Sequence, residues 1–387
     1  MATRKKYAQS VTRRRFVKIS AASIASTSLF MLGCSKSSQQ TDEPDSRSAR
    51  DASEQKEQQL PSSSTSTPMN REYVYVTEYA GNTLAAVDFE NQTIATRYPA
   101  GQNPMMAVEG DSVLYIGNSS GGKLQAFNID TGLNTPIAAG QQPLGLVIDE
   151  DAQILYACDY FSSAIQIIDT KLGSMTSSIP LSDVGFIGRT DPPACCRTTP
   201  DAGRRPVCMA KSSDGMLYCA NYGTYDIARI DLSSGEEIEP FDGVVGPRTM
   251  LLSKDESSIL LAGVGGENEE RVFDLYVIDR KTGTRFATIP IGEGVVDVCM
   301  NSTGNKAFAI ARDEGTLVEI DTVSWQELRR AQLEIGIGAI CLSNDDSTLY
   351  VANAETGELL AVDVESLETI SRVSGLSNPK DVAVLRG

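Results

Sequence analysis

The 387-residue sequence contains no histidine, and this absence removes much of the chemistry available to proteins. Without histidine there is no His-ligated haem, no His-type zinc or copper site, and no Ser-His or Cys-His catalytic pair. Aromatic residues make up 6% of the chain with a single tryptophan, and the eight cysteines form no C-x-x-C spacing. These absences count against a redox enzyme that holds its own cofactor.

Basic residues are scarce outside the N-terminus. Residues 1–33 hold seven of the 34 Lys and Arg residues and no acidic residue, so 27 basic residues face 51 acidic ones from Cys34 onward. That part of the chain carries a formal charge near −24. A surface this acidic repels phosphate groups, so we expect no nucleic-acid partner.

The N-terminus contains "TRRRFVKIS" (12–20), which resembles the twin-arginine export signal. The matching residues are Thr12, Arg13, Arg14, Phe16 and Lys18. A weakly apolar run of about 15 residues follows, shorter than the ~20 that span a bilayer. We therefore expect 1–33 to be a twin-arginine signal peptide; the alternative is a basic tail before a buried helix.

The apolar run ends in "FMLGC", which resembles a lipoprotein cleavage site with Cys34 as the lipidated residue. Met31 and Leu32 depart from the usual pattern of such sites. Residues 34–70 are rich in Ser, Gln, Thr and charge, a composition that buries too little apolar surface to fold. We expect a disordered tether that links a membrane lipid anchor to an extracytoplasmic domain.

A strand-turn-strand unit recurs from residue 71 onward, as in "LYVANAETGELLAVD" (349–363). Equivalent positions are Tyr75, Tyr115, Tyr156, Tyr218, Leu261, Phe308 and Tyr350, with spacings of 40, 41, 62, 43, 47 and 42. A further apolar run precedes each unit and another follows it. Four strands in a period of about 42 residues predict an all-β, seven-bladed β-propeller of four-stranded antiparallel blades.

The two ends of the repeat region predict how the ring closes. The first unit lacks its leading strand, whereas the chain ends in a leading strand with no unit after it. We expect Val382–Leu385 to pair with the strand around 73–77. The units "VYVTEYAGNTLAAVD" and "LYVANAETGELLAVD" resemble the YVTN-repeat propellers of bacterial and archaeal envelopes over residues 71–387. That resemblance implies a fold; its members include binding proteins, lactonase-like enzymes and subunits of cofactor-bearing dehydrogenases.

Strand order predicts that the turn between second and third strands shares one rim with the links between blades. We call this the upper rim. Both long insertions, 182–206 and 264–271, fall there, and long loops are often functional. The second strands end there at Glu78, Asn118, Asp159, Asn221, Val264, Ala311 and Asn353. The five polar residues of this set are candidate ligands for Ca²⁺, another divalent cation or a polar molecule; the alternative is that they cap turns.

Acidic residues also recur where the third strands end. They are Asp88, Asp169, Asp231, Asp279, Asp321 and Asp363, with Asn128 in the second blade. Turn residues follow them in nearly every blade. We therefore interpret this row as turn caps.

The first insertion carries adjacent cysteines, Cys195 and Cys196, and Cys208 begins the next strand. Outside the cytoplasm we expect a disulfide among these three, with a thiolate metal or redox site as the alternative. The insertion also contains arginines, among them Arg189 and Arg204, and Arg248 follows a proline at the start of an inner strand. They form a candidate basic patch for a carboxylate or an acidic partner, unless they pair with "ENEE" (267–270).

Three functions remain open from the sequence. The leading hypothesis is a non-enzymatic, monomeric envelope lipoprotein that binds a protein partner or a small ligand at the upper rim, without a cofactor. The second is a metal-dependent, lactonase-like hydrolase that uses the carboxylate and amide row. The third is an accessory subunit of an extracytoplasmic redox complex, since twin-arginine export carries folded proteins.

Overall fold

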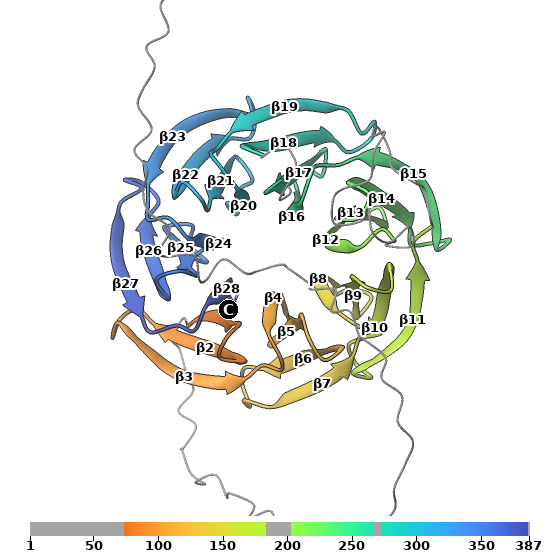
Figure 1. Cartoon of the computed structure of the whole chain (residues 1–387), viewed down its shortest axis with the longest axis horizontal. Helices are drawn as coiled ribbons and strands as arrows, with labels where there is room; N and C mark the ends of the chain where they lie inside the picture. The colour runs from red at the N-terminus through yellow and green to blue at the C-terminus, as the bar shows by residue number, and fades with distance from the viewer. Residues whose placement is uncertain (1–72, 183–202, 266–271, 386–387) are drawn as a thin grey trace, which may run out of the picture. The chain divides into compact units, whose positions relative to one another are not determined.

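A computed structural model describes residues 73–182, 203–265 and 272–385. In this part of the chain every regular element is a strand, and the strands form seven four-stranded antiparallel sheets around a common axis (Figure 1). The sheets are the blades of a seven-bladed β-propeller, which confirms the predicted fold. Within these residues no helix is long and apolar enough to cross a membrane.

Blades 1 to 4 follow one another along the chain, and the strands of each run in order from the innermost to the outermost. Blade 1 contains β28 (Pro379–Val384), β1 (Val74–Glu78), β2 (Thr83–Asp88) and β3 (Thr93–Pro99). Blade 2 contains β4 (Pro104–Gly110), β5 (Val113–Asn118), β6 (Lys123–Asn128) and β7 (Asn134–Ala138). Blade 3 contains β8 (Pro143–Asp149), β9 (Ile154–Asp159), β10 (Ala164–Asp169) and β11 (Ser174–Pro180). Blade 4 contains β12 (Pro206–Lys211), β13 (Met216–Asn221), β14 (Asp226–Asp231) and β15 (Glu236–Asp242).

Blades 5 to 7 complete the ring. Blade 5 contains β16 (Pro247–Leu252), β17 (Ser258–Gly263), β18 (Asp274–Asp279) and β19 (Arg285–Pro290). Blade 6 contains β20 (Val295–Met300), β21 (Lys306–Ala311), β22 (Thr316–Asp321) and β23 (Gln326–Gln332). Blade 7 contains β24 (Ile337–Leu342), β25 (Thr348–Asn353), β26 (Glu358–Asp363) and β27 (Thr369–Ser374).

Packing between blades explains the pattern of hydrophobic residues. Second strands such as β9 and β21 are buried on both faces, whereas fourth strands such as β23 are mostly exposed. The buried residues gather into seven clusters, and each cluster joins two neighbouring blades. Burial on both faces suppresses the apolar-polar alternation typical of a half-exposed strand.

The C-terminal strand closes the ring as predicted. In blade 1, β28 pairs antiparallel with β1, with Val74 opposite Val384 and Val76 opposite Val382. The described chain begins at Tyr73, beside this pairing, at the rim opposite the upper rim. No blade is therefore left with an unpaired inner strand.

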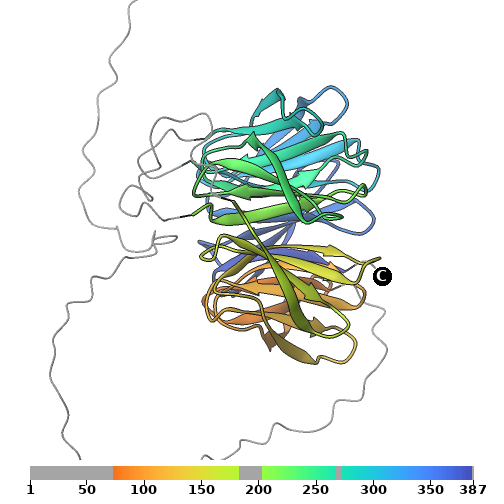
Figure 2. The same cartoon turned by 90° about the vertical axis from the view of Figure 1, so that its right-hand side faces the viewer.

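The two rims have different connections, and Figure 2 shows the ring edge-on with strands running between them. At the upper rim, second-to-third turns hydrogen-bond to links between blades, as Ala139 N–H does to Gly122 O at 3.1 Å and Val264 N–H to Gly246 O at 3.0 Å. At the lower rim, the predicted turn caps are confirmed. Side-chain oxygens of Asp88, Asn128, Asp169, Asp231, Asp279, Asp321 and Asp363 all accept backbone N–H groups of the turns that follow.

Several predictions concern residues outside those the structure describes. They include the signal peptide 1–33, the tether 34–70 with Cys34, and the insertion residues Arg189, Cys195 and Cys196. The described residues on either side of both insertions lie at the upper rim, because they join strand ends of that rim.

Candidate functional site: the axial end of the upper rim

Every inner strand has a β-bulge directly after its first residue. The ladder with the second strand shifts there in all seven blades. The extra residues are Met105, Leu144, Val207, Arg248, Val296, Gly338 and Lys380, with Gly145 also inside the shift in blade 3. A bulge leaves its extra residue outside the strand ladder and redirects its side chain. We call these seven residues the axial ring, since they surround the propeller axis at the upper rim.

Three cations meet at this ring. Arg248 and Lys380 are the charged members of the axial ring, and Arg312 directly follows the second strand of blade 6. Burial lowers the pKa of Arg248 to about 10, and repulsion by Arg312 adds to this. Burial, followed by repulsion from Arg248 and Arg312, lowers the pKa of Lys380 to about 8. Their mutual repulsion shows that these side chains, from three blades, share one region.

Aromatic rings lie beside the cations. The residue that follows the second strand is Tyr79 in blade 1, Tyr160 in blade 3 and Tyr222 in blade 4. The Lys380 Nζ atom lies 5.5 Å from the Tyr79 ring centroid, a cation–π distance. The Tyr160 and Tyr222 ring centroids are 6.3 Å apart. We call Arg248, Arg312, Lys380 and these three tyrosines the axial site.

Two carboxylates lie one residue further along their inner strands. Asp381 Oδ2 accepts the Ala107 N–H of blade 2 at 2.7 Å, and Asp297 Oδ2 accepts the Ile340 N–H of blade 7 at 2.9 Å. Burial raises the pKa of Asp297 to about 6. Burial, with repulsion by Asp297, raises the pKa of Asp381 to about 7. These two residues tie neighbouring inner strands together and place negative charge beneath the cations.

Gly338 leaves room at the axial site. A Cβ atom added to this residue would meet no heavy atom within 4 Å, whereas one on Gly145 would lie 2.5 Å from the Val207 carbonyl oxygen. The ring is therefore packed tightly between blades 3 and 4 and open at blade 7. Blade 7 lies between the blades that supply Arg312 and Lys380, so this open space is on their side of the ring.

The predicted row of oxygen ligands lies in five separate blades, and the structure places each side chain in contacts of its own rim loops. Asp159 accepts the N–H groups of Gln141 and Gln142 at 2.9 and 2.8 Å. Asn353 accepts two N–H groups of its own turn and donates to Ile335 O. Turn and link capping, the alternative interpretation, thus accounts for their contacts.

Glu78 has the most complete set of such contacts. It accepts hydrogen bonds from Arg97 Nε and the Ser377 N–H, both at 2.8 Å, and from Thr83. Burial acts to raise the pKa of Glu78, but these bonds outweigh it and lower the pKa. The Asn118 amide donates to Lys123 O and lines a recess of about 240 Å³ in blade 2. Their role as ligands of one Ca²⁺ ion stays a prediction.

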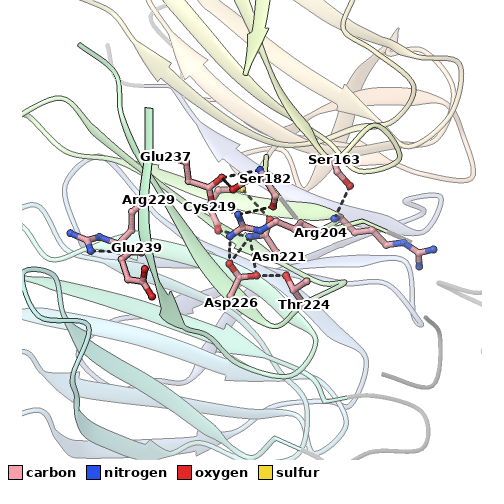
Figure 3. A network of polar contacts seen from close by, with 11 residues as sticks. Ser163, Ser182, Arg204, Cys219, Asn221, Thr224, Asp226, Arg229, Glu237 and Glu239 are labelled. Atoms are coloured by element: carbon pink, nitrogen blue, oxygen red, sulfur yellow. Dashed lines mark hydrogen bonds and ion pairs between the residues drawn. The ribbon is translucent and has the colours of Figure 1, made fainter. Parts of the chain in front are cut away.

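Arg204 belongs to a buried network rather than to an open basic patch (Figure 3). Its side chain is 1% exposed and forms ion pairs with Asp226 and Glu237. With its amide oxygen turned toward Arg204, Asn221 accepts from Nε at 3.3 Å and Nη2 at 3.2 Å. Burial raises the pKa of Asp226, although Arg204 and Thr224 act against it.

This network also holds the described ends of the first insertion. Glu237 accepts the backbone N–H and hydroxyl of Ser182, and Arg204 lies at the other end of the same insertion. The predicted patch is therefore divided. Arg204 stabilises blade 4, Arg248 belongs to the axial site, and Arg189 lies outside the described residues.

Cys208 is a buried thiol with no disulfide partner among the described residues, and Cys195 and Cys196 lie outside them, so the predicted disulfide stays a prediction. Cys219 lies on the neighbouring strand of the same blade, and its Sγ atom is 3.6 Å from Cys158 Sγ across the blade 3–4 interface. Burial raises the pKa of Cys158 and of Cys208 well above the usual thiol value. Among the residues that the structure describes, no group of three or more His, Cys, Asp or Glu side chains is arranged to hold a metal ion.

Sequence reasoning identified Arg248 but missed Lys380, Arg312 and the tyrosines. A signal for them was present in the repeats. Aligning the units on the prolines before the inner strands places Lys380 of "NPKD" on Arg248 of "GPRT". The bulge that turns this position toward the axis has no such signal.

Comparisons with known proteins agree on the fold. No family model matches the chain, and a search of curated proteins found no match. A functionally unknown protein from Desulfotomaculum acetoxidans has a similar structure, with a TM-score of 0.64 and 12% identity over 82% of this chain and 99% of that one. A protein from Lactobacillus plantarum reaches 0.62 and 17% over 81% and 99%. Kuenenia stuttgartiensis hydrazine synthase reaches 0.57 and 17% over 71% and 92%. At such low identity these likenesses show the β-propeller fold alone.

Proposed function

We propose that the chain is an exported, lipid-anchored propeller that binds an anionic ligand at the axial site. The observation that carries this proposal is that Arg248, Arg312 and Lys380, from three blades, lie close enough for their charges to act on one another, with free space at Gly338 of blade 7. Like charges brought together from three blades cost the fold electrostatic energy, since each lowers the proton affinity of its neighbours. A bound anion would offset this repulsion.

Arg248 and Lys380 are partly buried, which strengthens the argument. An ion pair at an exposed position contributes little, whereas a bound anion among partly desolvated cations gains more from the lower local dielectric. Arg312 is itself paired with Asp313 at 2.8 Å, where both side chains are over one third exposed. We therefore assign Lys380 a larger share of anion binding than Arg312.

The topology suits a tethered binding protein. The described chain begins at Tyr73 at the lower rim, and the sequence before it resembles a lipoprotein tether. The twin-arginine resemblance and the resemblance to YVTN-repeat envelope propellers support the same extracytoplasmic location.

The hydrolase hypothesis receives less support from the geometry. It requires several oxygen donors within about 2.3–2.6 Å of one ion. Glu78, Asp159 and Asn353 lie in separate blades, and each accepts hydrogen bonds from backbone N–H groups of the rim loops. We therefore retain binding as the function that the site supports best.

The proposal is tested by thermal unfolding of the detergent-solubilised full-length protein with sodium acetate, sodium benzoate or sodium chloride at equal ionic strength. We expect an organic anion to raise the melting temperature, and R248Q combined with K380Q to abolish the rise. The variant K171Q changes one charge at the lower rim and serves as the control. An identical response of all three proteins to all three salts would refute anion binding at the axial site.

A further inference from the structure

Asn118 differs from the other polar residues that end second strands, because its side-chain oxygen lacks a partner within the described chain. In blade 3 the equivalent Asp159 accepts hydrogen bonds from the Gln141 N–H, the Ser162 hydroxyl and the Gln166 amide. Asn118 is 1% exposed, yet its Oδ1 atom accepts no hydrogen bond from any described residue. A buried acceptor without a partner destabilises the fold, and a donor from outside the chain would remove that cost.

The orientation of the Asn118 amide is determined by its nitrogen. Nδ2 donates to Lys123 O at 3.0 Å, and turning the amide by 180° would place Oδ1 against that carbonyl oxygen instead. The unpartnered atom is therefore the oxygen, which is an acceptor. Only a hydrogen-bond donor or a cation can satisfy it.

A comparison with blade 3 shows what blade 2 lacks, since the two blades align without a gap from the link before the inner strand to the third strand. Gly121 stands in the position of Ser162, so the hydroxyl donor is absent. Gln125 stands in the position of Gln166, and it lines the recess of about 240 Å³ together with Asn118. Blade 2 therefore has a recess at the position where blade 3 supplies its own donors.

We call this space the blade 2 recess, and the side chains around it are polar. They belong to Gln102, Asn118, Ser120, Lys123 and Gln125. Asn118 is buried whereas Gln102 and Lys123 are exposed, so the unpartnered oxygen belongs to the inner part of the recess. Its volume of about 240 Å³ exceeds what one water molecule needs and lies below the roughly 300–1,000 Å³ of drug-sized pockets. A single sugar ring or a small polyol is of this size.

The charge of the lining selects among possible donors. A metal ion or an ammonium group would meet the positive charge of Lys123. A carboxylate or phosphate would place negative oxygens against Asn118 Oδ1. A hydroxyl group avoids both conflicts, and the amides of Gln102 and Gln125 both donate to hydroxyls and accept from them.

We propose that the blade 2 recess binds a neutral polyhydroxylated molecule, such as one sugar ring of a glycan, with a hydroxyl group donating to Asn118 Oδ1. The amides of Gln102 and Gln125 and the Ser120 hydroxyl bind the neighbouring hydroxyls of the same ring. This site is separate from the axial site, and it does not depend on the proposed function.

Saturation-transfer difference NMR of the full-length protein, solubilised in a detergent without a sugar head group, tests this proposal. Glucose, galactose and mannose are the probes, because they carry the same hydroxyls in different orientations. We expect transfer to at least one of them. Excess tetrahydropyran, which has the ring without hydroxyls, and calcium chloride, which offers a cation, should not displace the bound sugar.

Q125A and Q166A form a matched pair of variants, since these glutamines occupy the same position in neighbouring blades. Q125A should weaken sugar binding at least about tenfold, because it removes hydrogen bonds to the ligand, and should leave the melting temperature unchanged. Q166A should lower the melting temperature, because Gln166 donates to Asp159 at 3.1 Å, and should leave sugar binding unchanged. S120A removes a second contact and keeps the test valid if Q125A fails to fold.

Three outcomes would overturn the proposal. Equal sugar binding by the wild type, Q125A and S120A would place the sugar elsewhere on the protein. Displacement of the sugar by calcium chloride would make Asn118 Oδ1 a ligand of a cation. Absence of transfer to all three sugars would mean that the recess holds water alone. None of these results involves R248Q or K380Q, so a failure here is distinguishable from a failure of the axial site.

Discussion

Arg204 and Arg248 occupy neighbouring blades at the same rim, yet the charged groups around them differ. Arg204 precedes its inner strand, is 1% exposed, and pairs with the carboxylates of Asp226 and Glu237. Arg248 is the bulge residue of its inner strand and shares its region with two other cations. Arg204 lies before the proline that begins its inner strand, and Arg248 lies directly after the equivalent proline. This small difference in position separates a residue that stabilises the fold from a member of the axial ring.

The strongest test of this contrast is R204M, which removes the buried cation and keeps its volume. We expect the free energy of unfolding to fall by about 3–5 kcal/mol, because Asp226 and Glu237 lose their partner in a desolvated network. Denaturant unfolding of the full-length protein measures the change. The matched control R330M breaks an exposed pair with Glu327 and should cost less than about 1 kcal/mol.

If the lost ion pairs cause the instability of R204M, neutralising their carboxylates should reduce it. Neutralising the abandoned carboxylates in R204M/D226N/E237Q should restore part of the lost stability, since no buried charge is then left unpaired. A triple variant as unstable as R204M would mean that packing around the guanidinium, rather than charge, sets the cost. Equal stability of R204M and the wild type would remove the contrast with Arg248.

The cysteines beside this network provide the second test. Cys158, Cys208 and Cys219 are at most 2% exposed, and burial raises the pKa of the first two. Since the thiolate is the nucleophile, iodoacetamide at pH 8 should label them at least about a hundredfold more slowly in the native than in the urea-unfolded protein. Mass spectrometry of the labelled peptides reads out each site. Fast native labelling of Cys158 would show that the blade 3–4 interface opens.

The fold was largely predictable from the sequence because the same strand pattern recurs in seven units, and each unit supports the assignment of the others. Seven units with similar spacing determine the number of blades, and the missing first strand predicts closure by β28. The Asp row was predictable for the same reason, since a residue such as Asp363 recurs with the turn it caps. Local physics acts identically in each blade, so the pattern is visible seven times.

The site was less predictable because it arises where blades differ. Lys380 is distant in sequence from Arg248, and only ring closure and two bulges bring them together. Arg204 looked like part of an open patch, because its partners Asp226 and Glu237 come from later strands. The contact between the Cys158 and Cys219 thiols likewise depends on how blades 3 and 4 pack, and local sequence spacing does not encode that packing.

A third test compares the axial carboxylates with the buried network. The folded pKa of Asp381, about 7, exceeds its unfolded value of 3.8, so folding favours the neutral acid. Its stabilising contribution is complete below pH 3.8 and is lost as the pH rises to about 7. D381N cannot ionise, so its stability relative to the wild type should rise by about 3 kcal/mol between pH 4 and 7. In D297N the gain should be smaller and should end near pH 6, because the pKa of Asp297 is about 6. A pH-independent difference for both variants would contradict the assigned shifts.

The smallest expected effect concerns the axial cations themselves. Lys380, with a pKa of about 8, faces Arg248, Arg312 and the Tyr79 ring, with Asp381 beside it on β28. An anion favours the protonated amine, so benzoate affinity should fall about tenfold between pH 7 and 9 as Lys380 loses its proton. Asp381 contributes chiefly below pH 8, whereas Arg248 keeps its charge over most of this range, since its pKa is about 10.

Titration calorimetry at pH 8 in two buffers of different ionisation enthalpy should detect net proton uptake by the wild type and less by K380Q. If K380Q showed the same fall in affinity between pH 8 and 9, the titrating group would be another residue. Anion binding at the axial site would then depend on Arg248 and Arg312 rather than on Lys380.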